Sequence, residues 1–313
     1  MMQQYTHDRI AIVGAGHVGS TAAYALMLRA LVREIVLIDS DAALAEAEAI
    51  DISDANALAR PAKIWAGDYG DAATARLAII TAGAATYGNE TRLSVADRSA
   101  KIVRECVDAL MAAGFDGILI IASNPVDVMA HVAFSRAGLP SNQVIGTGTL
   151  LDSSRFQQAL ASRFDVASGA IEAVVIGEHG DSEVAVFSTV RIGGISLDQF
   201  APNQTQTFTK LADDVRTAGY RIIEGKGHTS FGVATAIVRI CEAILRDERT
   251  VLPVSTLLTG EFGFSDVYLS LPCILGASGI ERILLPDLDS NERSQLRISG
   301  QKIQSALAGL NLK

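Results

Sequence analysis

The first half of the chain alternates short, uninterrupted apolar runs with longer segments of helical periodicity. The apolar runs cover residues 10–13, 35–38, 77–80 and 118–121, and the helical segments cover residues 18–30, 42–57 and 92–112. Strands that are apolar at every position are typical of a parallel sheet covered by helices on both faces. The alternation predicts an α/β fold built on a doubly wound parallel sheet with right-handed crossovers.

The pattern changes after about residue 147. It predicts helices over residues 151–163, 205–224, 233–246 and 291–308, and strands over residues 173–176, 184–190, 250–258 and 265–271. Because these elements no longer alternate regularly, they indicate a second, mixed α/β domain. We therefore expect one domain over residues 1–147 and another over residues 148–313.

Charge and hydropathy exclude several classes of function. The net charge is −9 and no long run of one sign occurs, which disfavours nucleic acid and anionic membranes as partners. No apolar stretch reaches the roughly 20 residues needed to span a bilayer. The polar N-terminus lacks the apolar core of a signal peptide. The sequence therefore predicts a cytoplasmic protein with no membrane or nucleic-acid partner.

The three cysteines are Cys106, Cys241 and Cys273, which are far apart and lie in apolar segments. This pattern is typical of reduced, buried thiols. No group of cysteines and histidines has the spacing of zinc ligands. We expect neither a disulfide nor a metal site.

A glycine-rich motif lies between the first predicted strand and helix. Gly14, Gly16 and Gly19 form a GxGxxG pattern, which permits a tight turn, close approach of a pyrophosphate and close packing of helix on strand. Phosphates would bind the N–H groups at the helix N-terminus. Asp39 ends the next strand, where a carboxylate binds both ribose hydroxyls and repels a 2′-phosphate. The motif predicts a Rossmann-type domain that binds NAD, and an ordinary turn followed by an exposed aspartate is the alternative.

Four further segments have polar residues among apolar or glycine-rich neighbours. They are residues 89–93 (NETRL), 123–127 (SNPVD), 151–156 (LDSSRF) and 177–182 (GEHGDS). Together with the glycine motif, they resemble the L-lactate/malate dehydrogenase family, and its lactate-type branch in particular. The resemblance runs in order from about residue 9 to residue 310. It implies an NAD-dependent dehydrogenase acting on a small 2-oxo or 2-hydroxy acid.

Three residues have roles that both the resemblance and their chemistry support. Reduction of a 2-oxo acid needs a proton donor at the carbonyl oxygen, and His179 lies in a glycine-flanked turn and titrates near neutrality. Asp152 would accept the other imidazole N–H and favour the imidazolium. Arg155, on the same helical face, can hold the substrate carboxylate by two hydrogen bonds. A surface-loop histidine and an ordinary intrahelical Asp–Arg pair are the alternatives.

The resemblance assigns three more residues to the substrate. It implies that residues 83–91 close over the substrate and bring Arg92 to the carbonyl oxygen, where Arg92 stabilises developing charge. A solvated arginine at a helix start is the alternative. The resemblance also implies that Asn124 hydrogen-bonds the substrate carbonyl and that Thr229 lines the substrate pocket.

Further contacts with the cofactor follow from the resemblance alone. They are Val18, Tyr69, Gly83, Ala84, Ala122, Asn124 and Thr147. Two nearby histidines receive no catalytic role. His17, inside the glycine motif, is expected to be solvated, and His228, beside Thr229, is expected to be structural.

The sequence departs from the family at Thr86, where lactate dehydrogenases usually carry glutamine and malate dehydrogenases arginine. Without a cation there, the second carboxylate of oxaloacetate would be enclosed unpaired, so malate is disfavoured. Threonine also leaves more room than glutamine. A 2-oxo acid with a longer side chain, as for L-2-hydroxyisocaproate dehydrogenase, is therefore the alternative to pyruvate.

Two positions concern regulation. Gln157 and Glu172 stand where relatives activated by fructose 1,6-bisphosphate carry arginine and histidine. Because a glutamate repels phosphate, we expect no activation by this sugar bisphosphate. The family implies a homotetramer. A non-enzymatic NAD-binding regulator is a further alternative. Such a regulator would not need His179, Asp152, Arg92 and Arg155 all to be present.

Overall fold

The computed structural model describes residues 9–59, 61–84, 92–202 and 205–310. Within these residues, a nine-stranded sheet has the order β12-β11-β10-β6-β5-β4-β1-β2-β3. Six parallel strands come from the first half of the chain: β1 (Arg9–Val13), β2 (Glu34–Ile38), β3 (Lys63–Ala66), β4 (Leu77–Ile80), β5 (Ile118–Ile121) and β6 (Val144–Gly146). The predicted α/β fold with a doubly wound parallel sheet is confirmed.

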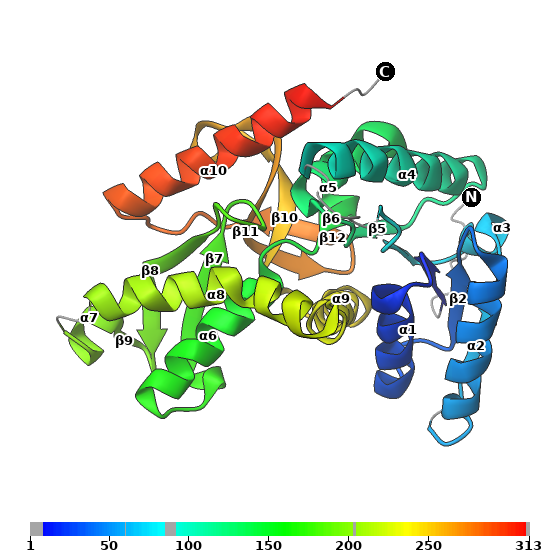
Figure 1. Cartoon of the computed structure of the whole chain (residues 1–313), viewed down its shortest axis with the longest axis horizontal. Helices are drawn as coiled ribbons and strands as arrows, with labels where there is room; N and C mark the ends of the chain where they lie inside the picture. Colours follow the sequence, from blue (N-terminus) through cyan, green and yellow to red (C-terminus); the bar gives the residue numbers. More distant parts are fainter. Residues whose placement is uncertain (1–8, 60, 85–91, 203–204, 311–313) are drawn as a thin grey trace.

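Helices cover both faces of the parallel strands (Figure 1). One face of the main sheet packs against α1 (His17–Arg29), α2 (Ala42–Asn56) and α9 (Phe231–Leu245), and the other against α3 (Tyr69–Ala72), α4 (Arg92–Ala112), α5 (Val126–Ala137) and α10 (Ser290–Gly309). In both groups the last helix, α9 or α10, lies against the antiparallel strand β11. In β1, Ile10 and Ile12 pack on the first face, whereas Ala11 and Val13 pack on the second. Complete burial of each isoleucine contributes about 1.5–3 kcal/mol, which explains why the strands are apolar throughout.

The second half of the chain contributes to two sheets. β10 (Thr250–Thr259), β11 (Ser265–Gly276) and β12 (Gly279–Ile283) are antiparallel and extend the main sheet. The link is the pairing of Ser255 in β10 with Gly146 in β6. A second sheet consists of β7 (Ile171–Ile176), β8 (Val184–Ile192) and β9 (Ile195–Ser196). The main sheet thus continues across the expected domain boundary at residue 147, which remains a prediction.

Three further α-helices and three short 3-10 helices complete the described helices. They are α6 (Leu150–Phe164), α7 (Leu197–Phe200), α8 (Thr205–Lys226) and the 3-10 helices Ser141–Gln143, Ser168–Ala170 and Glu261–Gly263. Among the described helices, none combines the length and apolar character that crossing a membrane requires. The three cysteines are unpaired and buried, as predicted, and burial raises the pKa of each thiol.

Some elements have no counterpart in the sequence prediction. β6 has only three residues, and α5 is buried over most of its surface, so it shows no amphipathic stripe. The strand predicted to end at Leu271 continues through Pro272, which faces Pro253 of β10.

Candidate active site

The glycine motif forms a tight turn at the carboxyl end of β1. Gly14 has φ +109°, and a Cβ atom there would lie 2.6 Å from the backbone nitrogen of Ala82. A Cβ atom on Gly19 would overlap the Gly14 carbonyl oxygen, so only glycine lets α1 pack this closely on β1. At Gly16, a Cβ atom would meet nothing within 4 Å, and no side chain caps the N-terminus of α1. The turn therefore leaves open space in front of free N–H groups, which fits a pyrophosphate.

Asp39 is fixed against this turn at the end of β2. Its Oδ2 accepts a hydrogen bond from the backbone N–H of Ala15 at 2.6 Å, and its Oδ1 accepts one from the N–H of Asp41 at 2.9 Å. The carboxylate is half-buried and keeps accepting capacity at both oxygens. Asp39 thus fits the position expected for a group that binds ribose hydroxyls.

The other predicted cofactor residues lie at the same edge of the main sheet. Val18 is in the first turn of α1, Tyr69 follows β3, Gly83 and Ala84 follow β4, Ala122 and Asn124 follow β5, and Thr147 follows β6. The N–H of Ala84 donates to Ser99 Oγ at 3.2 Å, and the N–H of Thr147 donates to the Ile121 carbonyl at 2.9 Å. Ligands bind at the carboxyl ends of strands in such sheets, so this edge is the candidate cofactor site.

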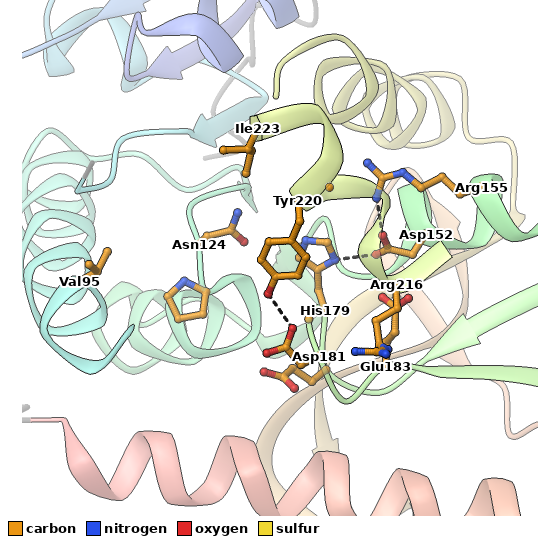
Figure 2. Close-up of a pocket in the computed structure, with 14 residues that line it drawn as sticks. Val95, Asn124, Asp152, Arg155, His179, Asp181, Glu183, Arg216, Tyr220 and Ile223 are labelled. Carbon is orange, nitrogen blue, oxygen red and sulfur yellow. Dashed lines mark hydrogen bonds and ion pairs between the residues drawn. The ribbon is translucent and has the colours of Figure 1, made fainter. Parts of the chain in front are cut away.

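Asp152 joins two cationic groups at the centre of the second site (Figure 2). Its Oδ2 lies 2.6 Å from His179 Nδ1, and its Oδ1 accepts a hydrogen bond from Arg155 Nη1 at 2.8 Å. The Asp152 side chain is 3% exposed, against 29% for His179 and 21% for Arg155. The aspartate is therefore a buried anchor, whereas both cations remain accessible to a ligand.

The turn that carries His179 is held from behind by Asp127. Gly177 and Gly180 flank His179 with φ of +90° and +159°, and the His179 N–H donates to Asp127 Oδ2 at 2.8 Å. Asp127 Oδ1 accepts from Ser255 Oγ at 2.6 Å. Burial raises the pKa of Asp127 to about 6, although these hydrogen bonds oppose the shift. Sequence reasoning did not assign Asp127, and its one signal is a charge in an otherwise apolar helix start.

The charges around His179 favour its imidazolium form. Burial alone would lower the pKa of His179, but its contact with Asp152 outweighs burial and raises the pKa to about 9. Burial would likewise raise the pKa of Asp152, but His179 and Arg155 together lower it. Burial and the nearby charge of Asp152 raise the pKa of Glu183 to about 8. At neutral pH, the site therefore contains an imidazolium–carboxylate pair beside a protonated Glu183.

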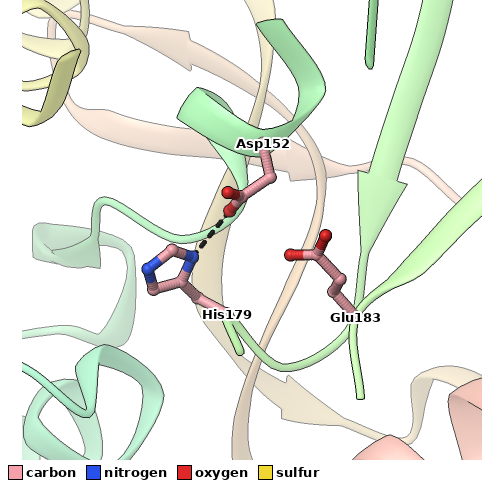
Figure 3. A group of neighbouring side chains, drawn as sticks. All are labelled: Asp152, His179 and Glu183. Carbon is pink, nitrogen blue, oxygen red and sulfur yellow. Dashed lines mark hydrogen bonds and ion pairs between the residues drawn. The ribbon is translucent and has the colours of Figure 1, made fainter. Parts of the chain in front are cut away.

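Asp152, His179 and Glu183 also satisfy the spacing of metal ligands, since one ligand atom of each lies within 4.8 Å of the others (Figure 3). Both Asp152 oxygens, however, already contact His179 or Arg155. His179 Nε2 lies on the side of the ring away from Asp152 (Figure 3). This geometry suits proton donation from Nε2.

A cavity of about 330 Å³ opens in front of these residues. Its lining includes Asn124, Arg155, His179, Gly219, Tyr220 and Ile223. Figure 2 shows the Tyr220 hydroxyl bound to Asp181, at 2.6 Å. Sequence reasoning missed the wall formed by α8, because its lining residues carry no signature beyond helical periodicity.

The chain matches two family models. Residues 8–146 match the NAD binding domain of lactate/malate dehydrogenase, and residues 149–310 match the alpha/beta C-terminal domain of the same proteins. The chain belongs to the lactate/malate dehydrogenase family. The first match is to an NAD binding domain, which confirms the prediction that the cofactor is NAD.

Similar sequences and similar solved structures also belong to lactate dehydrogenases. The chain is 43% identical to L-lactate dehydrogenases of Priestia megaterium, over 96% of both chains, and of Thermus aquaticus, over 96% of this chain and 99% of the other. A crystal structure of the minor L-lactate dehydrogenase from Enterococcus mundtii in its ligands-bound form superposes with a TM-score of 0.95 at 36% identity. That match covers 98% of this chain and 99% of the other.

The remaining predicted substrate residues lie either outside the described residues or outside the cavity lining. Thr86 lies outside the described residues, as does the side chain of Arg92, which begins α4. Thr229 is half-buried between α8 and α9 and is not part of the cavity lining. Away from the cavity, Gln157 Nε2 donates to the Ala173 carbonyl at 2.9 Å, and Glu172 is exposed on β7.

Proposed function

We propose that this chain is an NAD-dependent L-lactate dehydrogenase that reversibly reduces pyruvate to L-lactate. The observation that carries the proposal is the arrangement of His179 and Arg155 on opposite oxygens of the buried Asp152, facing one cavity. A general acid and a carboxylate-binding cation at one cavity are what reduction of a 2-oxo acid needs. The similarity to L-lactate dehydrogenases over nearly the whole chain supports the same activity.

Substrate binding is assigned to Arg155. One guanidinium nitrogen is bound to Asp152, and the side chain remains partly exposed, so its other N–H groups are available to the substrate carboxylate. Asn124, exposed at the end of β5, would hydrogen-bond the carbonyl oxygen. These contacts orient the carbonyl carbon toward the edge of the sheet where the cofactor binds.

Proton transfer is assigned to His179. Asp152 holds Nδ1, so the imidazolium can donate its Nε2 proton to the carbonyl oxygen as that oxygen gains charge. NAD held at the glycine turn would supply or accept the hydride. In lactate oxidation, neutral His179 takes the proton back. Arg92 would stabilise charge on the carbonyl oxygen when residues 83–91 close and exclude water.

The variant His179→Asn tests this assignment. We expect kcat for pyruvate reduction to fall about 10²- to 10⁴-fold, which is the usual contribution of a general acid. NADH affinity, measured by fluorescence titration, should stay within about threefold of the unmodified protein, because the cofactor residues are unchanged. Activity that survives this substitution would exclude His179 as the proton donor.

Longer 2-oxo acids are a second candidate class of substrate, and Gly219 favours them. This glycine lies within α8 on the cavity wall, and a Cβ atom there would meet nothing within 4 Å. A glycine inside a helix costs roughly 0.5–1 kcal/mol relative to alanine, yet here it leaves room in the cavity. With Thr86 in place of glutamine, Gly219 supports a pocket that accepts side chains longer than a methyl group.

The pair Gly219→Ala and Gly225→Ala tests this second candidate. Both glycines are in α8, but only Gly219 lines the cavity. We expect Gly219→Ala to lower kcat/KM for 2-oxoisocaproate relative to pyruvate about fivefold, as for loss of space for one methylene, while Gly225→Ala leaves the ratio unchanged. If the ratio of kcat/KM for 2-oxoisocaproate to that for pyruvate were equal in both variants, Gly219 would not provide room for longer substrates. Thr86→Gln should shift the ratio in the same direction as Gly219→Ala.

We also propose a cytoplasmic homotetramer that fructose 1,6-bisphosphate does not activate. Tyr24 and Leu28, one turn apart on α1, are exposed, as is Ile50 on α2, and such apolar surface favours association between subunits. Light scattering coupled to size-exclusion chromatography would measure the mass, and a monomer would contradict the tetramer. Lowered KM for pyruvate upon adding the sugar bisphosphate would contradict the absence of activation.

A further inference from the structure

Two histidines that the proposed catalysis does not use are stacked on each other. The rings of His17 and His228 have centroids 3.9 Å apart and planes inclined by 15°. His17 begins α1 inside the glycine motif, and His228 lies between α8 and α9. His17 is exposed, as expected for a solvated residue, and the structural role expected for His228 stays a prediction. Their contact joins the cofactor turn to a segment from the other half of the chain.

The stacked rings lie next to the space where a pyrophosphate fits. His17 directly follows Gly16, where a Cβ atom would meet nothing within 4 Å, and the N-terminus of α1 has no side-chain cap. His17 is exposed, and His228 is half-buried. An imidazole at the first helical position can reach an anion bound by the first N–H groups of the helix.

The groups around His228 disfavour its protonation in the free protein. Burial, His17 and Lys226 all lower the pKa of His228, although a hydrogen bond to the Lys226 backbone opposes the shift. The Lys226 ammonium lies over the Phe231 ring, 4.2 Å from its centroid. The first turns of α1 and α9 carry no acidic side chain, and Asp39 is engaged by the Ala15 and Asp41 amides. An anionic ligand would supply the counter-charge that this surface lacks.

We propose that His17 and His228 form an imidazole clamp on the cofactor pyrophosphate, which takes up a proton when NADH binds. The pyrophosphate carries two negative charges and stabilises an imidazolium beside it. NADH affinity is therefore greatest at low pH and falls as pH rises through the imidazole pKa of the complex. The clamp also links cofactor binding to the α8–α9 connection, in which Thr229 is the next residue. The inference rests on NAD binding and not on the identity of the 2-oxo acid.

Isothermal titration calorimetry with NADH measures this proton directly. Titrations at about pH 7 in PIPES and in ACES, which differ in ionisation enthalpy, give the number of protons taken up. We expect uptake of a fraction of one proton, and an NADH dissociation constant that rises about threefold to tenfold between pH 6 and pH 8. ADP-ribose, which keeps the pyrophosphate, should show the same uptake, and adenosine, which has no phosphate, should show none.

Three variants identify the source of the proton. His17→Asn and His228→Phe should each reduce the uptake and flatten the pH dependence of the dissociation constant, and His228→Phe keeps an aromatic ring for stacking. His179→Asn is the matched control and should retain the uptake. Unchanged uptake in both clamp variants, or no uptake in the unmodified protein, would overturn the clamp. Failure of the unmodified protein to bind NADH would instead contradict the proposed function.

Discussion

The cofactor turn and the substrate site hold negative charge by different means. Around Gly16, backbone N–H groups at the start of α1 face open space, and the surrounding glycines are needed because side chains would clash. Around Asp152, two cationic side chains converge on one buried carboxylate. Backbone N–H groups bind phosphate without titrating, so a proton taken up at the cofactor turn would come to the flanking imidazoles and not to the groups that hold the phosphate. The charges of Asp152, His179 and Arg155 are instead tuned by burial and by each other. The first arrangement suits a constant ligand, and the second suits a group that must exchange a proton.

Asp152→Asn should give the largest effect, because it removes the anchor of the side-chain site. The pKa of His179 is raised to about 9 when Asp152 is charged, and the amide cannot sustain that shift. Pyruvate reduction needs the imidazolium, so the alkaline limit of kcat/KM should move from near pH 9 toward about 6.5. At pH 8, this shift alone should lower the rate about 30-fold. Loss of the fixed imidazole tautomer and orientation should bring the total loss to about 10³-fold or more.

The pH profile of kcat/KM for pyruvate reduction measures this prediction. Gln158→Ala, at an exposed position on the same helix, is the matched control and should leave the profile unchanged. An Asp152→Asn profile that keeps its alkaline limit near pH 9 would show that Asp152 does not set the protonation of His179.

Gly14→Ala and Gly16→Ala separate two requirements of the glycine turn. Gly14 is needed for close backbone packing, and Gly16 for close approach of the pyrophosphate. A Cβ atom at Gly14 would clash with Ala82 in a left-handed conformation, so we expect a loss of about 1–3 kcal/mol in the free energy of unfolding. A Cβ atom at Gly16 meets no protein atom, so stability should hold while NADH affinity falls about tenfold or more. Denaturant titration and NADH fluorescence titration measure the two quantities. Equal NADH affinity in Gly16→Ala and the unmodified protein would mean that the pyrophosphate does not approach this backbone.

Glu183→Gln should have the smallest effect and acts on stability. The pKa of Glu183 is about 8 in the folded protein, against an ordinary value of 4.5, so the unfolded chain loses this proton first as pH rises. The contribution of Glu183 to stability therefore falls between about pH 4.5 and pH 8, and glutamine removes this contribution. At pH 8, we expect Glu183→Gln to be more stable by about 1–2 kcal/mol, with no difference at pH 4. Urea unfolding at both pH values tests this, and a variant less stable at pH 8 would contradict a protonated Glu183.

The tight glycine turn and its neighbour Asp39 could be predicted from the sequence, because these parts are close together along the chain; their binding of NAD stays a prediction. Gly14, Gly16, Gly19 and Asp39 belong to one strand–helix–strand unit, and their spacing carries the chemistry. The substrate site was recognisable only by family resemblance, since Asn124, Asp152 and His179 come from separate segments. Nothing local in these segments indicates that they meet.

The remaining features depend on contacts that no local pattern encodes. Asp127 supports His179 only because β10 joins the main sheet and brings Ser255 to it, 128 residues away. The same three-residue strand β6 that escaped prediction forms this junction. Glu183 and Gly219 acquire their roles from the folding of β8 and α8 around Asp152. The roles of Asp127, Glu183 and Gly219 therefore depend on burial and on tertiary contacts rather than on residue type.

The most direct test is kcat/KM with NADH for pyruvate, 2-oxobutyrate, 2-oxoisocaproate, phenylpyruvate and oxaloacetate. We predict efficient reduction of pyruvate or a longer monocarboxylic 2-oxo acid, and poor reduction of oxaloacetate, which has a second carboxylate. An optimum at pyruvate fits the lactate assignment, and an optimum at longer chains fits the room left at Gly219. Preference for oxaloacetate, or no NADH oxidation with any of the five acids, would contradict the account.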